Sequence, residues 1–182
     1  ASFIDSAFCQ DGSAAMLDVY NTVWTSSGDF KDWLPSKFDK PSSPVAIECH
    51  SSGLWVVGSG SNLINSTDQG KTWRVGSFDE DAQFTALAFT SDTTGIAFGE
   101  FGMLTFTNDG GQTWKVVNQL FNQGIIVYNL SFSRDYILAS TDHGVYFSDI
   151  NDGIFWMKMP ITSDQTGEKI LTENIYSAIS IG

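Results

Sequence analysis

The sequence predicts an all-β fold built from a series of similar antiparallel sheets, and two observations carry this prediction. First, an eight-residue stretch at residues 107–114, Thr-Asn-Asp-Gly-Gly-Gln-Thr-Trp, returns about every 40 residues along the chain. We call this stretch the box. Second, aromatic residues make up 14% of the 182 residues and glycines number 17, which is typical of strands joined by tight turns.

The box occurs four times. The second copy, residues 66–73, matches the third closely, whereas residues 148–156 carry one extra residue and residues 26–33 form a degenerate first copy. The tryptophans that close the four copies are spaced 40, 41 and 42 residues apart: Trp33, Trp73, Trp114 and Trp156. This spacing assigns one box to each repeat.

Each residue type in the box suits a tight turn. The aspartate and the opening Ser or Thr can hydrogen-bond nearby backbone N–H groups, glycine can adopt positive φ, and tryptophan can seal one end of a hairpin core. We therefore expect the box residues to be structural and not catalytic. They are Ser66, Asp68, Gly70, Trp73, Thr107, Asp109, Gly111, Trp114, Ser148, Asp152 and Trp156.

Short apolar runs bounded by turn residues predict consecutive hairpins between the boxes. One column of this pattern, three residues before each box, is apolar in every repeat: Val23, Leu63, Leu104 and Val145. The first repeat has predicted strands at 4–9, 14–19 and 21–25, and then a loop containing Pro35, Pro41 and Pro44. The later repeats have predicted strands at 45–49, 54–58, 63–66 and 74–78; at 84–89, 95–99, 103–107 and 115–117; and at 126–132, 136–140, 145–148 and 157–159.

One domain over residues 1–182 is expected, with repeats at about 2–40, 44–80, 83–120 and 125–162 and the first strand of a fifth at 174–182. Four short antiparallel strands in each repeat of about forty residues describe the blade of a β-propeller. Both predicted end strands are first strands of a blade, so we expect an arc or fragment of a larger propeller; a closed four-bladed ring is the alternative.

Composition and charge exclude several functions. The formal charge is −12 with nine Lys and Arg, which argues against nucleic acid and anionic membranes as partners. No apolar run is long enough to span a bilayer, and the chain as given begins without the features of a signal peptide. His50 and His143 lack metal-ligand spacing, so we expect no metal or cofactor. Cys9 and Cys49, each 24 residues before a box tryptophan, are either bridged or buried as free thiols.

The boxes at 66–73 and 107–114 resemble the Asp-box, or bacterial neuraminidase repeat, of a superfamily of β-propellers. Sialidases and xyloglucan-cleaving enzymes are more distant members. The sialidase resemblance implies three arginines, but the chain has two, Arg74 and Arg134. The xyloglucanase resemblance implies a pair of carboxylates; Glu48 and Glu100 are the candidates, with Asp18 as a further acid beside an apolar strand.

Residues 95–102 together with the following box are similar to the repeat of the photosystem II stability and assembly factor family and its bacterial and phage relatives. That resemblance implies a non-catalytic docking surface, although this chain lacks that family's arginine-rich surface. We therefore expect a binding or scaffold module for a protein or glycan partner, with contacts from Trp24, Trp55 and Phe101. A cell or virion surface is the favoured location, and missing sequence or another chain would complete the propeller. The alternative is a glycoside hydrolase that uses Glu48 and Glu100.

Overall fold

The computed structural model describes residues 1–39, 43–51, 53–60, 62–77, 83–117, 124–151, 153–162, 166–167 and 175–176. These residues form four sheets, each of four antiparallel strands in sequence order, with no α-helix among them. The first sheet contains β1 (Phe3–Phe8), β2 (Ala14–Asp18), β3 (Thr22–Ser26) and β4 (Leu34–Lys37), and the second contains β5 (Pro44–His50), β6 (Gly53–Gly58), β7 (Asn62–Ser66) and β8 (Arg74–Ser77). The third contains β9 (Phe84–Phe89), β10 (Gly95–Gly99), β11 (Leu104–Thr107) and β12 (Lys115–Val116), with the 3-10 helix η1 (Glu100–Gly102) after β10; the fourth contains β13 (Val127–Phe132), β14 (Tyr136–Thr141), β15 (Gly144–Asp149) and β16 (Met157–Lys158).

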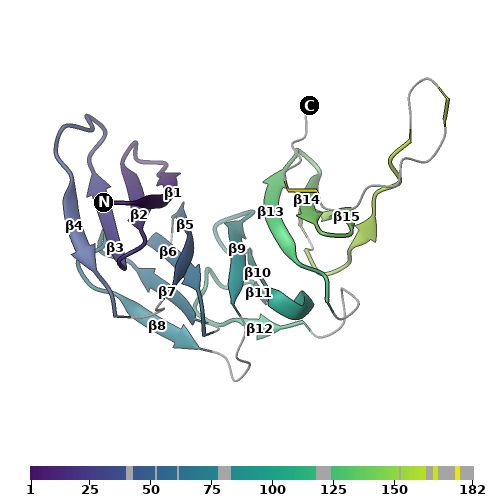
Figure 1. Cartoon of the computed structure of the whole chain (residues 1–182). Helices are drawn as coiled ribbons and strands as arrows, with labels where there is room; N and C mark the ends of the chain where they lie inside the picture. The colour runs from purple at the N-terminus through teal and green to yellow at the C-terminus, as the bar shows by residue number, and fades with distance from the viewer. Residues whose placement is uncertain are drawn as a thin grey trace.

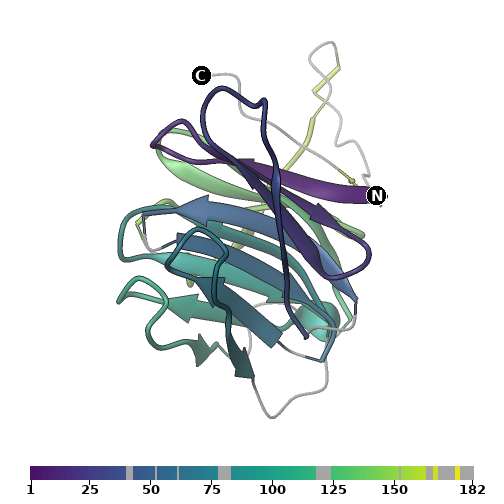
Figure 2. The same cartoon turned by 90° about the vertical axis from the view of Figure 1, so that its left-hand side faces the viewer.

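The four sheets follow one another along an open arc, with the first and fourth sheets at its two ends (Figures 1 and 2). The first strand of each sheet contacts the first strand of the next, in the order β1, β5, β9 and β13. This is the arrangement of propeller blades around an axis. The described residues therefore form four blades of a β-propeller, and the alternative of a closed four-bladed ring is wrong.

Each pair of neighbouring blades encloses its own hydrophobic core. In β6, Leu54 and Val56 pack towards the first sheet, whereas Trp55 and Val57 pack towards the third. Successive side chains on a strand point to opposite faces, so a strand between two blades must be apolar at every position. The middle strands β6 and β10 are accordingly almost continuous apolar runs.

The strand predictions agree with the structure at nearly all positions, but one prediction is wrong. The tail of the first repeat was expected to be a loop because of its prolines, yet β4 includes Pro35 and pairs with β3. β4 is the outermost strand of its sheet, where a proline need not donate a hydrogen bond to a further strand. The predicted strand at 174–182 lies outside the described residues, apart from Ile175, whose N–H donates to the Thr141 carbonyl at 2.7 Å, and Tyr176.

The box forms a tight turn closed by its own polar side chains. Asp68 accepts hydrogen bonds from the Thr72 N–H at 2.8 Å and the Thr72 hydroxyl at 2.6 Å, and the Ser66 hydroxyl donates to it at 2.8 Å. Ser66 Oγ also accepts from the Gly70 N–H at 2.8 Å. Together these bonds lower the pKa of Asp68 to about 2, with the Thr72 hydroxyl as the largest cause.

The third box repeats this geometry: Asp109 holds Thr107 and Thr113 in the same way, and its pKa is also lowered to about 2. In the fourth box, Ser148 is buried and Trp156 Nε1 donates to the Gly153 carbonyl at 2.8 Å; Asp152 lies outside the described residues.

The second, third and fourth boxes then dock on the preceding blade. Gly111 has φ +86°, and a Cβ added there would lie 2.3 Å from the Trp55 ring; a Cβ at Gly153, with φ +63°, would lie 2.4 Å from Ile96. Only glycine allows both this backbone conformation and this close approach.

The closing tryptophan provides the apolar part of the contact between blades. Trp114 packs edge to face on Trp55 at 5.7 Å and on Phe89 at 6.0 Å, and the first-blade Trp33 instead stacks on Phe30 of its own box at 6.5 Å.

A disulfide between Cys9 and Cys49 joins the first and second blades across a sequence separation of 40 residues. The sequence is compatible with a disulfide or with two buried free thiols, and the structure shows the disulfide. Cys9 directly follows β1 and Cys49 is the last residue but one of β5, so the bridge ties the two inner strands together at one end.

We predict that the double substitution Cys9→Ser/Cys49→Ser lowers the free energy of unfolding by about 4 kcal/mol, because it removes the constraint on a loop of this length in the unfolded chain. Urea unfolding monitored by tryptophan fluorescence measures the change. A reducing agent should destabilise the natural sequence by a similar amount and leave the double variant unaffected. Equal stability of the oxidised protein and the variant would contradict the prediction.

We also predict that Trp114→Ala lowers the free energy of unfolding by about 3 kcal/mol, because the indole packs on two aromatic rings of the blade interface. Trp33→Ala is the matched control and should cost less, since its partner Phe30 is itself 45% exposed. Thermal unfolding of both variants provides the comparison, and similar costs at the two positions would argue against a role for the box tryptophan in joining blades.

Candidate functional site

The two acids predicted as a catalytic pair lie in neighbouring blades. Glu48 is on β5, the inner strand of the second blade, and Glu100 begins η1, directly after β10 of the third. Glu100 is held by the chain next to it, because its Oε2 accepts from the Gln83 N–H at 3.4 Å and its own N–H donates to the Gln83 carbonyl at 2.8 Å.

Glu48 has a different carboxylate as its charged neighbour. Burial raises the pKa of Glu48 to about 7, and the negative charge of Asp5 adds to the effect. Asp5 lies on β1 and accepts a hydrogen bond from the Ile47 N–H at 2.8 Å, which links the inner strands of the first two blades. A carboxyl that stays protonated near neutral pH beside a second carboxyl is an arrangement that can donate a proton.

Asp18, the third acid considered from the sequence, is fully used by its own turn. It is 3% exposed and accepts hydrogen bonds from the Tyr20 N–H at 2.8 Å, the Thr22 N–H at 3.1 Å and Trp24 Nε1 at 3.1 Å. Burial raises the pKa of Asp18, but these hydrogen bonds outweigh it, so the pKa lies below its usual value. The carboxylate therefore anchors Trp24 and the turn.

The three aromatic residues predicted to make contacts lie in unlike surroundings. Trp24 is half-buried and packs edge to face on Phe3 at 6.4 Å. Trp55 is 4% exposed and belongs to the interface between the second and third blades. Phe101 is 71% exposed and has a φ of 59°, an unfavourable conformation for a bulky residue that holds its ring in solvent.

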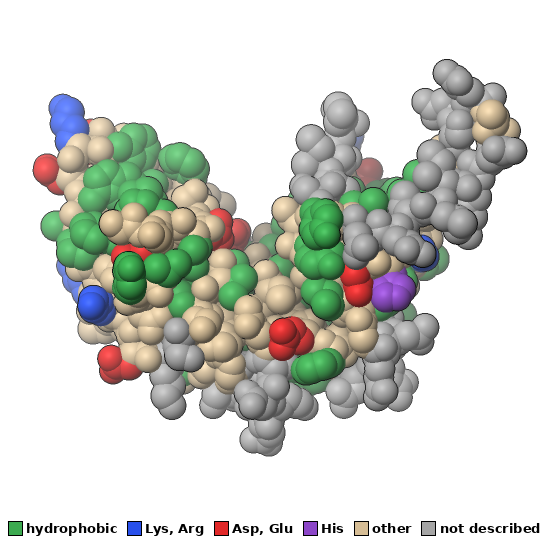
Figure 3. Space-filling model, in the orientation of Figure 1, with side chains coloured by type: hydrophobic (Ala, Val, Ile, Leu, Met, Phe, Trp, Pro, Cys, Tyr) green, Lys and Arg blue, Asp and Glu red, His purple; other side chains and the backbone are tan. Residues whose placement is uncertain are grey.

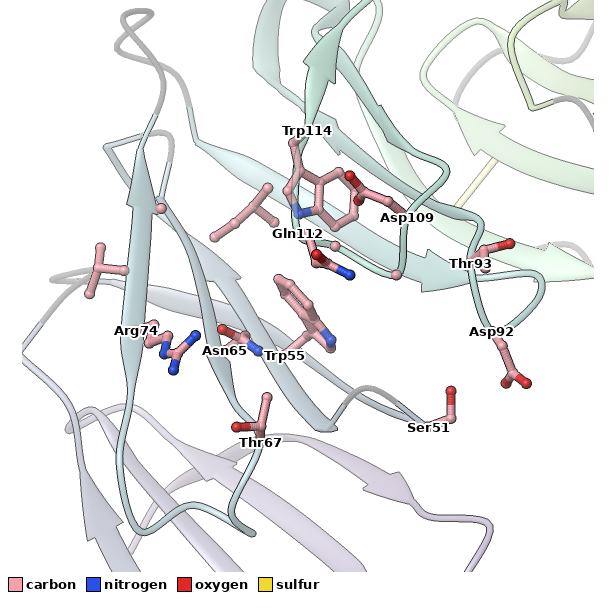
Figure 4. Close-up of a pocket in the computed structure, with 15 residues that line it drawn as sticks. Ser51, Trp55, Asn65, Thr67, Arg74, Asp92, Thr93, Asp109, Gln112 and Trp114 are labelled. Atoms are coloured by element: carbon pink, nitrogen blue, oxygen red, sulfur yellow. The ribbon is translucent and has the colours of Figure 1, made fainter.

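A cavity of about 790 Å³ lies between the second and third blades (Figure 4). Trp55, Asn65 and Arg74 line it from one row across β6, β7 and β8, where they are directly paired. Trp114 and Gln112 line it from the third box, and Asp92 and Thr93 from the turn after β9. The cavity therefore combines indole rings, two amides, one guanidinium and two carboxylates, those of Asp92 and Asp109.

The hydrogen-bonding groups of this cavity are largely unused. Within the described part of the chain, the side chains of Asn65, Arg74 and Gln112 make no hydrogen bond or ion pair, and the buried Trp114 Nε1 has no acceptor. Other lining groups have partners: Asp92 lies 3.6 Å from His50 Nε2, and Asp109 is hydrogen-bonded within its box. An unpaired buried donor costs free energy, so a bound acceptor here would be stabilising.

A second cavity, of about 910 Å³, lies between the first two blades and is bounded on one side by the Cys9–Cys49 bridge. Its other lining residues come mostly from turns, including Ser27, Thr67 and Gln69. The charged side chains that line this cavity lie in short loops. The cavity therefore has fewer polar groups held in fixed positions than the first cavity.

The end of the arc formed by the first blade is apolar. Hydrophobic side chains gather over the first blade in the space-filling view (Figure 3). On the face of the first sheet that points away from the second blade, Phe3 and Phe8 are 49% and 76% exposed. In the second to fourth blades, the corresponding side of the sheet is covered by the preceding blade.

Two classes of site find no support in the described residues. They contain no group of three or more His, Cys, Asp or Glu side chains that could hold a metal ion. None of their helices is long and apolar enough to cross a membrane.

No protein-family model matches the chain, and no curated protein matches it in sequence. Solved structures are similar in fold. The protein YCF48 from Cyanidioschyzon merolae aligns at 18% identity with a TM-score of 0.65 over 81% of this chain, and a structure described as YCF48 bound to D1 peptide aligns at 14% identity with a TM-score of 0.60 over 87%. An ancestral GH74 enzyme aligns at 17% identity with a TM-score of 0.71 over 91%.

The chain spans 50% and 68% of the two YCF48 chains and 25% of the GH74 chain. At these identities the likeness establishes the β-propeller fold. The first cavity is the feature that the sequence does not reveal, because its lining residues come from two blades and the spacing along the chain does not show which of them lie together.

The raised pKa of Glu48 predicts that Glu48→Gln increases the free energy of unfolding in a pH-dependent way. Below its usual pKa of 4.5 the carboxyl is protonated in both the folded and the unfolded chain; as the pH rises towards 7, the unfolded chain releases the proton first and stability is lost. Removing the carboxyl removes this loss. We therefore expect Glu48→Gln to match the natural sequence at pH 4 and to exceed it at pH 8 by up to about 3 kcal/mol.

Urea unfolding across this pH range measures the difference. Glu100→Gln is the matched control, because it makes the same chemical change in η1, and it should not reproduce the gain. A stability difference for Glu48→Gln that is independent of pH would show that burial and Asp5 do not hold the proton.

Proposed function

We propose that this chain is part of a non-catalytic β-propeller that binds a protein partner through cavities and loops between its blades. The observation that carries the proposal is that the box carboxylates are already hydrogen-bonded, whereas donors that line the first cavity are not. The carboxylates of Asp68 and Asp109 are hydrogen-bonded within their turns, whereas Arg74 and the Trp114 N–H have no partner among the described residues of the first cavity. Unpaired donors that border a cavity are suited to binding.

The turns are, on this proposal, Asp-boxes, and loops carried on them form the binding surface. Phe101 supports the same role, because an exposed aromatic ring held in an unfavourable backbone conformation is suited to contact with a partner. The structure described as YCF48 bound to D1 peptide shows that a protein of similar fold binds a peptide. A glycan is the other partner that indole rings and planar amides would suit.

Two further features extend the proposal. The disulfide suits an oxidising compartment or a cell or virion surface. The apolar end of the arc, where Phe8 and Phe30 pack edge to face at 6.0 Å, suits burial beneath a further blade of the same kind.

One observation favours a second function. The protonated Glu48 beside Asp5 resembles the acid of a glycoside hydrolase, which makes hydrolysis by Glu48 and Glu100 the competing proposal. It requires the two carboxyls to act on one glycosidic bond.

We expect labelled protein to bind members of a peptide array, and binding to weaken in Phe101→Ser or Arg74→Gln. A glycan array and a polysaccharide panel, assayed for reducing sugar, are run with the same preparation. Binding to glycans alone would replace the protein partner by a glycan. Release of reducing sugar that is abolished in Glu48→Gln or Glu100→Gln would overturn the non-catalytic proposal.

A further inference from the structure

One column of the repeat differs between blades in a way that bears on the first cavity. The tenth residue after the box opening is Ser36 in the first blade, Gly76 in the second and Val117 in the third. Each is paired or hydrogen-bonded with an apolar residue of the neighbouring strand that faces the next blade, namely Val23, Leu63 and Leu104. The column therefore faces the closing tryptophan of the following box.

In two blades the side chain in this column completes the surroundings of that tryptophan. Ser36 Oγ accepts a hydrogen bond from Trp73 Nε1 at 3.0 Å. Val117 packs in the same hydrophobic core as Trp156, whose Nε1 turns to the Gly153 carbonyl instead. A polar residue supplies an acceptor, and an apolar residue fills the space.

The second blade does neither. Gly76 has no side chain to offer, it lines the first cavity together with Trp114, and Trp114 Nε1 is buried without an acceptor among the described residues. The backbone does not require glycine here, because φ lies outside the left-handed region and an added Cβ would meet only the Leu63 carbonyl at an ordinary 3.5 Å. The glycine thus opens the cavity above a free indole donor.

Arg74 borders the same space. It precedes Gly76 by two residues on β8, so both face the third blade at a Cα separation of about 7 Å. Figure 4 shows the Arg74 side chain reaching across β8 towards Asn65, on the side of the cavity that Trp55 lines. An indole N–H and a guanidinium are both donors only, so a ligand atom between them must be an acceptor.

Neither of the two described acids that line this cavity supplies that acceptor. Both oxygens of Asp109 hold Thr113, and Asp92 lies beside His50 at the far end of the cavity. A carboxylate from outside would match the guanidinium fork with two parallel hydrogen bonds and accept a third from the indole.

We propose that Arg74, Trp114 and the space over Gly76 form a subsite for a carboxylate carried by an extended peptide of the partner. A peptide is favoured because β8 is the outermost strand of its sheet and no described strand pairs with its free edge. Val75, which is 49% exposed, adds an apolar contact beside it. This subsite rests on the proposed function and names the chemistry that the partner presents.

The test follows the indole N–H resonance of Trp114 in ¹⁵N-labelled protein, assigned with Trp114→Phe. The probes are acetyl-Gly-Gly with a free carboxyl terminus, acetyl-Asp-Gly-amide, and the uncharged control acetyl-Asn-Gly-amide; glucuronate tests whether a sugar acid suffices. We expect the resonance to shift with at least one carboxylate peptide, which also shows whether a terminal or side-chain carboxylate is preferred. It should not shift with the asparagine control, and Arg74→Gln should weaken binding about tenfold or more.

Reciprocal substitutions provide the matched controls. Gly76→Ser places the hydroxyl of the first blade in the second, so it should raise Tm, engage the Trp114 N–H and abolish the shift. Ser36→Gly makes the opposite change beside Trp73 and should leave binding at Trp114 unaltered. Both variants are expected to fold, because each residue already occurs at the equivalent position of the neighbouring blade.

Several results would overturn the subsite: no movement of the Trp114 resonance with any carboxylate peptide, an equal shift with the asparagine control, or a larger shift with glucuronate than with either peptide. Unchanged peptide binding by Gly76→Ser would do the same. The peptide array separates this failure from that of the proposed function. Array binding that persists in Gly76→Ser leaves the binding module in place and removes this subsite, whereas no array binding by the natural sequence removes both.

Discussion

The structure depends on the docking of each box against the preceding blade. A four-stranded sheet of this size is marginal alone, because both of its faces are apolar and each needs a neighbour. The box joins the blades as follows: its polar side chains fix a turn, the turn puts a glycine at positive φ, and the glycine lets the backbone approach side chains of the preceding blade. At Gly111 the approach to Trp55 is so close that any larger residue would displace the indole. The closing tryptophan then covers the end of the core that the turn has reached.

This division of labour explains why the aspartates of the box are poor candidates for chemistry. Asp68 has its two oxygens occupied by groups of its own turn, and its lowered pKa records how strongly the charged form is held. An acid that must stay ionised to keep a turn closed is not free to exchange a proton. Among the described residues, Glu48 is the one carboxyl with a raised pKa; it lies on an inner strand away from any box, and its neighbour Asp5 serves the link between two blades.

Sequence periodicity was sufficient to predict the sheets because the faces between neighbouring blades are buried in equivalent ways. Columns such as Leu63 and Leu104 must then be apolar in each repeat, and the strand positions follow. β4 was not predicted because Pro35 is a turn signal in most contexts. A strand tolerates proline on the outer edge of a sheet, and the sequence alone does not show which strand lies at the edge. The bridge between Cys9 and Cys49 depended on the distance between neighbouring blades, which spacing along the chain does not give.

The first cavity was harder to foresee for a different reason. Repeats are recognised by what they share, whereas a site arises where one repeat departs from the others. The sequence shows this difference as serine, glycine and valine at the tenth position after the box opening in the first three blades. Its effect can be inferred only once the structure shows that this position faces a tryptophan N–H. A small residue at a position that is filled in the other blades leaves a hollow and an unsatisfied hydrogen-bond donor. Both lower the stability of a closely packed structure. In a propeller whose joins are otherwise interchangeable, such a position distinguishes one interface from the next and is where selectivity for a ligand can be acquired without loss of the fold.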